Sequence, residues 1–117
     1  MKLRIAGGST DVSLVIFIQS TASVDGAGLT GLVFNTAGLS CYYVRPGAAD
    51  AQLALANVAV AGAHADGGFV EIDAANMPGW YRLDLSDAIV AAGVTSVGIQ
   101  AKGAADMAQL SIEIQLT

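Results

Sequence analysis

Hydrophobic and polar residues alternate with a period of two in three segments of the chain, 69–73, 80–85 and 109–117. Such alternation is typical of a β-strand with one face against a core and the other against solvent. In residues 80–85 the outward positions hold Arg82 and Asp84. The positions predicted to face the core are Val70, Ile72, Tyr81, Leu83, Leu85, Leu110, Ile112, Ile114 and Leu116.

Residues 12–19 differ from this pattern because they carry apolar side chains on both faces. Val15 and Phe17 occupy the face opposite Leu14 and Ile16. The segment is rich in β-branched and aromatic residues, which favour a strand. Apolar groups on both faces predict either a central strand or a strand whose outer face meets a neighbouring molecule. Val15 and Phe17 are therefore candidate contact residues.

Further short strands are expected at 32–34, 39–45 and 94–101, because turn residues such as Asn, Gly and Pro interrupt the apolar runs. Residues 52–60 alternate only weakly, and their alanines also suit a helix. Together, about seven to eight short strands predict an all-β, antiparallel β-sandwich. No linker is visible, so residues 1–117 are expected to form one domain.

One short helix is predicted at 86–92. Ser86 suits an N-cap, Asp87 suits the positive end of a helix, and Gly93 suits its C-terminal end. At the start of the chain, residues 1–9 form either an N-terminal arm that adds an edge strand to a partner or the first strand of the domain's own sandwich. The sequence leaves both alternatives open.

Charged residues make up 13% of the chain, about half the share in an average soluble domain, whereas hydrophobic residues reach 54%. A surface poor in charge favours assembly, because docking desolvates few charged groups. The net charge is −5 and the five bases are scattered, which argues against nucleic-acid and membrane partners. No apolar run is long enough to span a membrane, and residues 7–11 would interrupt a signal peptide, so synthesis in the cytoplasm is expected.

A turn is predicted at Met77-Pro78-Gly79, and Trp80 and Tyr81 follow it directly. In immunoglobulin-like sandwiches a tyrosine near such a corner donates a hydrogen bond to upstream backbone. We therefore expect Pro78, Gly79 and Tyr81 to form a structural corner. Trp80 points to the face opposite Tyr81, where it either contacts a partner or packs at the rim.

The chemistry-bearing residues do not combine into a catalytic, cofactor or metal site. His64 has Asp66 nearby but no Ser or Cys nucleophile at a known spacing, and it is expected to lie exposed in a loop. Cys41, the only cysteine, is expected to be a small buried hydrophobe. Residues 26–31 match the letters of a dinucleotide motif without its strand-to-helix context. A protein that is not an enzyme and binds no cofactor is therefore expected.

The segments 26–45, 68–73, 77–88 and 112–116 resemble small β-domains of tailed-bacteriophage structural proteins. Gly-Gly-Phe-Val-Glu-Ile-Asp and Met-Pro-Gly-Trp-Tyr-Arg-Leu-Asp-Leu carry the resemblance most clearly, and it extends over nearly the whole chain from Val12 onward. It implies an immunoglobulin-like sandwich and a virion structural protein. A capsid decoration or cement protein is favoured by analogy of size, and a tail or baseplate accessory module is the alternative.

The resemblance also implies a homo-oligomer or multi-copy assembly with the major capsid protein or tail proteins, located in the virion after synthesis in the host cytoplasm. A carbohydrate-binding module that recognises a host glycan is a further alternative. Its candidate aromatic platforms are Trp80, Tyr42 and Tyr43. The enzyme alternative requires a convergent acid–base pair in the folded structure.

Overall fold

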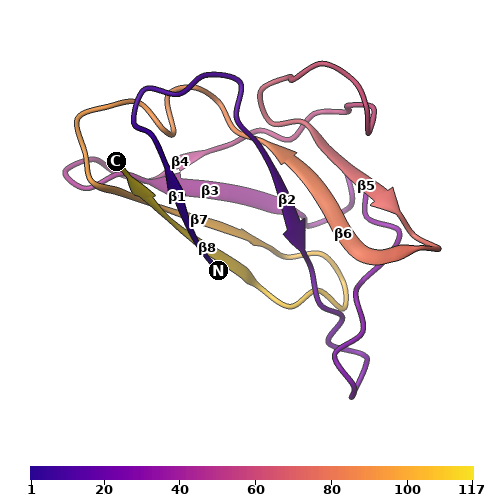
Figure 1. The fold of residues 1–117 in the computed structure, drawn as a ribbon. Coiled ribbons are helices and arrows are strands. Elements are labelled where there is room, and N and C mark those ends of the chain that lie inside the picture. The colour runs from indigo at the N-terminus through magenta and orange to yellow at the C-terminus, as the bar shows by residue number, and fades with distance from the viewer.

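Two β-sheets form the computed structural model, which describes residues 1–117 (Figure 1). The larger sheet has the strand order β1-β8-β7-β3-β4 and the smaller sheet the order β2-β6-β5. All neighbouring strands are antiparallel except β1 and β8, which run parallel. The strands are β1 (Lys2–Ile5), β2 (Ser13–Phe17), β3 (Ser40–Val44), β4 (Ala51–Gln52), β5 (Phe69–Asp73), β6 (Met77–Asp84), β7 (Ser96–Lys102) and β8 (Leu110–Leu116).

The core lies between the two sheets. Ile16 from β2, Leu83 from β6 and Ile114 from β8 are almost fully buried there. The Phe69 ring stacks on the Tyr81 ring with 5.0 Å between centroids and 8° between planes. The core-facing positions expected in residues 80–85 and 109–117 are confirmed, as is the all-β architecture. Burial of each large apolar side chain contributes about 1.5–3 kcal/mol to folding.

The smaller sheet differs from expectation in β5, where the predicted inward positions are wrong. Phe69 is buried in the core, whereas Val70 pairs with Arg82 on the outer face and Ile72 follows Val70 by alternation. Glu71 consequently lies on the Tyr81 side of the sheet. Glu71 is half-buried at the rim, where its carboxylate accepts a hydrogen bond from Gly31 N at 3.3 Å.

The short helix predicted at 86–92 is absent. A turn at 87–90 follows β6 in its place. Its single local backbone hydrogen bond joins Ile89 N to Ser86 O at 3.0 Å. The Arg45 guanidinium donates to the carbonyls of Ala88, Ile89 and Ala92 at 2.9–3.3 Å, so these acceptors need no helical partner. Two turns of helix are marginal on their own, and tertiary contacts decide the outcome.

Three other expectations change. The strand expected at 32–34 does not form, and Phe34 and Asn35 lie in a turn closed by a hydrogen bond from Thr36 N to Val33 O. The weakly alternating segment 52–60 keeps only the end of β4 and a single bridge between Ala56 and Gly68. The strand expected at 12–19 is β2, at the edge of the smaller sheet and not at its centre.

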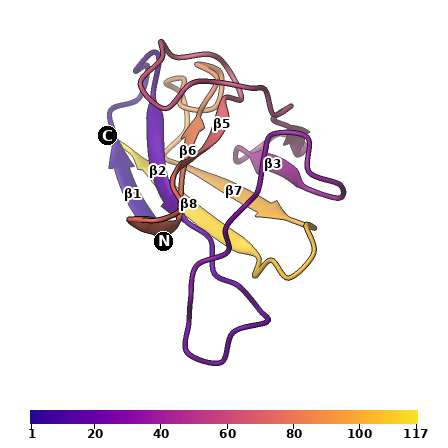
Figure 2. The same ribbon diagram turned by 90° about the vertical axis from the view of Figure 1, so that its right-hand side faces the viewer.

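The N-terminal residues form the first strand of the protein's own larger sheet. Lys2 through Ile5 pair in register with Glu113 through Leu116 of β8. The segment that connects β2 to β3 projects away from both sheets in the two views (Figures 1 and 2). No helix in the structure has the length and apolar character needed to cross a membrane.

Candidate functional site

Tyr81 connects β6 to the segment that links β2 with β3. Its hydroxyl donates a hydrogen bond to the Leu29 carbonyl at 2.6 Å and accepts one from Leu32 N at 3.3 Å. Burial raises the pKa of Tyr81 to about 12. The Leu29 carbonyl lies 52 residues upstream, whereas a tyrosine corner reaches backbone only a few residues away. The contact therefore fixes a long connection between the sheets.

The turn predicted at Met77-Pro78-Gly79 is wrong, because these residues belong to β6 and the turn between β5 and β6 lies at 74–76. The connection between β2 and β3 passes close to Gly79 within β6. Gly79 has a φ of 90°, and a Cβ on it would lie 2.5 Å from the Gly28 Cα. The Gly79 carbonyl accepts a hydrogen bond from Ile18 N at 2.8 Å, which continues the pairing of β2 and β6. Glycine is required here because other residues rarely adopt this φ and would collide with backbone.

The three candidate contact residues lie together on the outer side of the smaller sheet. Phe17 and Trp80 are paired across β2 and β6, with ring centroids 5.5 Å apart at 55°. Val15 is 51% exposed, and Trp80 is half-buried. With Val70 and Ile72 of β5 they form what we call the outer apolar face, defined as Val15, Phe17, Val70, Ile72 and Trp80.

A buried carboxylate lies beside this face, at the end of β6. The side chain of Asp84 has no exposed surface. It accepts hydrogen bonds from Arg82 Nε and Nη2 at 2.8 and 2.9 Å, from Ser13 Oγ at 2.6 Å and from Ala65 N at 3.0 Å. Burial raises the pKa of Asp84, but these hydrogen bonds lower it by more, so it lies below its ordinary value.

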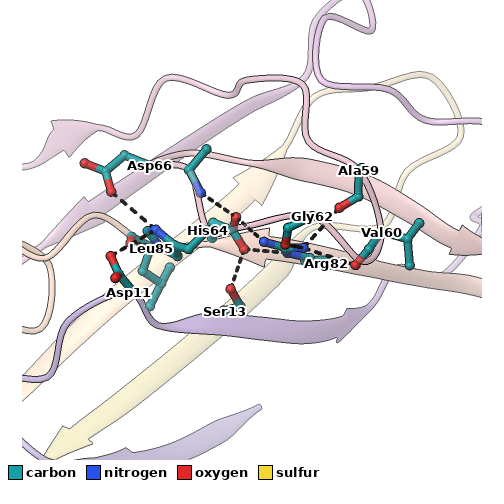
Figure 3. A network of polar contacts seen from close by, with 11 residues as sticks. Asp11, Ser13, Ala59, Val60, Gly62, His64, Asp66, Arg82 and Leu85 are labelled. Atoms are coloured by element: carbon teal, nitrogen blue, oxygen red, sulfur yellow. Dashed lines mark hydrogen bonds and ion pairs between the residues drawn. The ribbon is translucent and has the colours of Figure 1, made fainter.

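The Arg82 side chain extends this network to a loop (Figure 3). Its Nη1 donates to the carbonyls of Ala59, Val60 and Gly62 at 3.0, 3.1 and 2.8 Å. We call residues 59–65 the strap, because they cover the Asp84 end of the smaller sheet. Arg82 and Asp84 do point away from the core as predicted, but the strap removes them from solvent.

His64, within the strap, also departs from expectation. Its side chain is only 10% exposed. Nε2 lies 2.8 Å from the Leu85 carbonyl and therefore carries the hydrogen, while Nδ1 lies 3.4 Å from Asp11 and 3.9 Å from Asp66 (Figure 3). The prediction of an exposed loop histidine is wrong, because this hydrogen bond attaches the strap to the end of β6.

The remaining candidates lie apart from one another. Cys41 is buried as predicted, and burial raises its pKa to about 11. Tyr42 is exposed on the outer side of the larger sheet, whereas Tyr43 packs against the core, so neither lies near Trp80 on the smaller sheet. No three His, Cys, Asp or Glu side chains are grouped so as to hold a metal ion. No protein-family model, curated protein or solved structure matches this chain.

The strap network is the part of the site that the sequence reasoning missed. The available signal was the pair Arg82 and Asp84, two opposite charges on the same face of a strand in a chain with few charges. The loop carbonyls that receive Arg82 lie 20–23 residues earlier. No spacing rule connects a strand to acceptors at that separation.

Replacement of Tyr81 by Phe is expected to reduce the free energy of unfolding by about 1–2 kcal/mol, because the Leu29 and Leu32 backbone groups lose their partner. Urea denaturation followed by tryptophan fluorescence measures the change. Tyr43→Phe is the matched control, since the Tyr43 hydroxyl makes no hydrogen bond within the protein. Equal stability of the two variants would show that the Tyr81 hydroxyl does not hold the connection.

Replacement of Asp84 by Asn is expected to destabilise the fold at neutral pH by about 3–5 kcal/mol, because it leaves the buried Arg82 without its counter-charge. Ser13→Ala removes one hydrogen bond only, and a smaller loss of about 1 kcal/mol is expected. Asp66→Asn, at an exposed position, is the control and should change little.

The pH dependence provides a second measure of the same carboxylate. The pKa of Asp84 is lower in the folded protein than its ordinary value of 3.8. Its contribution to stability is therefore complete above that value and is lost as the pH falls through the folded pKa. Urea titrations between neutral and acidic pH should show a shallower loss of stability in Asp84→Asn than in the unaltered chain. Parallel curves would contradict the assignment.

Proposed function

We propose that the chain is a non-enzymatic structural protein of a bacteriophage virion, a capsid decoration or cement protein that docks through its outer apolar face. The observation that carries this proposal is the grouping of Val15, Phe17 and Trp80 on one open side of the smaller sheet. Aromatic anchors surrounded by smaller apolar side chains are typical of the centre of a protein interface.

An immunoglobulin-like class for the sandwich is part of the proposal, and the strand order supports it. In that fold, strands B, E and D share one sheet, and strands C, F and G share the other, which gains C′ in variable-type domains. Assigning β2 through β8 to B, C, C′, D, E, F and G gives the orders B-E-D and G-F-C-C′. β1 lies beside β8, whereas the first strand of a constant-type domain joins B, E and D.

The scarcity of charge supports assembly through this face. Only 13% of the residues are charged, and none of the five side chains of the outer apolar face is among them. Arg82, the one base that projects from the same side of β6, is already bonded to Asp84 and the strap. Docking on this face therefore desolvates no free charge. A stable contact of this kind buries more than about 1,000 Å² in total.

The test is incorporation of the chain into virions. Mass spectrometry of purified particles should find the protein in fixed stoichiometry, and its copy number separates a head location from a tail location. Val15→Lys should reduce the amount retained on particles by about tenfold, because an ammonium group would be buried without a partner. Val24→Lys is the control, since Val24 is fully exposed in the segment between β2 and β3.

Two results would contradict the proposal. The first is recovery of the protein only as a free species in lysates of infected cells. The second is equal retention of the Val15 and Val24 variants on particles, which would place the contact elsewhere on the surface. Circular dichroism of both variants verifies that the exposed substitutions leave the fold intact.

A further inference from the structure

The larger sheet carries a groove on its outer side, away from the outer apolar face. The groove has a volume of about 640 Å³ and runs over the middle strands β3, β7 and β8. Gly98 of β7 lies between Val44 of β3 and Glu113 of β8 in the register, and it contributes no side chain at that point. Tyr42, on β3, borders the same groove and is 40% exposed.

Polar groups of complementary type line the groove beside Tyr42. Gln100 pairs with Tyr42 across β3 and β7, and its amide N–H donates to the Gln109 side-chain oxygen at 2.8 Å. That hydrogen bond orients the Gln100 amide and leaves its oxygen free to accept a further hydrogen bond. Ser111, opposite Gln100 on β8, adds a hydroxyl that both donates and accepts.

Asp50 and Lys102 contribute one charge of each sign to the groove lining, and Glu113, beside Gly98, lies 3.6 Å from Lys2. A phosphate-bearing or otherwise anionic ligand would need several bases, and only one is present. A peptide that adds as a strand needs free backbone groups, but β3 and β7 are each paired on both sides. Recognition in this groove must therefore use side chains, and a neutral ligand rich in hydroxyl groups suits them.

We propose that this groove binds a neutral oligosaccharide, with Tyr42 beneath a sugar ring and the Gln100 and Ser111 side chains bonded to sugar hydroxyls. An aromatic side chain with a few oriented polar groups is the usual composition of a small-ligand site. The absence of a side chain at Gly98 lets the ring approach the strand backbone. This site goes beyond the virion role, and its test does not require that role to be correct.

The test uses the isotope-labelled full chain, titrated with maltotetraose, chitotetraose and a galactose-containing tetrasaccharide at millimolar concentration. Shifts of the backbone amide signals of β3, β7 and β8 are expected with at least one of these probes. Gly98→Val should weaken that binding by about tenfold or more, because its side chain fills the groove. A Cβ at Gly98 meets only Val44 Cγ1, at an ordinary 3.5 Å, so the variant is expected to fold.

Two more variants make the result specific. Tyr42→Ala should weaken binding to a similar degree in a chain that still folds, because Tyr42 lies outside the core and is 40% exposed. Trp80→Phe, on the other sheet, should bind as the unaltered chain does. The proposal is overturned if none of the probes shifts the β3, β7 and β8 signals, if Gly98→Val binds as tightly as the unaltered chain, or if only the Trp80 variant loses binding.

Discussion

The buried carboxylate of Asp84 is the constraint from which the arrangement of the smaller sheet follows. A carboxylate without exposed surface remains ionised only if it is fully hydrogen-bonded, and Asp84 has partners on β2, on β6 and in the strap. Arg82 completes the arrangement by donating to three strap carbonyls. The strap is therefore held by charge and hydrogen bonding, and it closes only the Asp84 end of the sheet.

The position of the strap determines which part of the smaller sheet's outer side stays uncovered. Along β6, the outward side chains are Trp80, Arg82 and Asp84, and the strap covers the last two. Trp80 and its neighbour Phe17 are left at the uncovered end, where their rings pack against each other. The outer apolar face is thus bounded on one side by a saturated polar network. A partner that docks there meets apolar surface without competing for the ion pair.

Sequence patterns predicted the all-β architecture and the inward residues of β6 and β8, because a period of two is a local property. They failed where a distant segment decides the outcome. In β5, both Phe69 and Val70 are apolar, so alternation alone does not identify the buried face. The stacking of Phe69 on Tyr81 determines that Phe69 faces the core. The strap buries Arg82 through contacts with residues 20 or more positions earlier. Arg45 likewise bonds the carbonyls of the segment predicted as a helix at 86–92 from more than 40 positions away.

The outward placement of Val15 and Phe17 was predictable for a related reason. Val15 and Phe17 stood out because they place apolar groups on the second face of a strand, a local feature. Their meeting with Trp80 required the register of β2 against β6, which only the fold provides. Tyr42 was a candidate sugar platform from the sequence, but the groove beside it could not be foreseen. It arises from Tyr42, Gly98, Gln100 and Ser111 on three strands whose order the sequence does not specify.

The edges of the larger sheet favour contacts through faces over contacts through strand addition. β1 covers the edge of β8, and its outward side chains are Lys2 and Arg4, with Lys2 3.6 Å from Glu113. The opposite edge is β4, only two residues long. Charged side chains and short edge strands both disfavour the addition of a further strand. A neighbouring molecule that paired with either edge would meet the charged side chains of β1 or the short strand β4. The two outer faces, by contrast, are open. The two faces differ in chemistry, because the larger sheet exposes Tyr42 and Val44 among polar side chains, whereas the outer apolar face holds no charged residue.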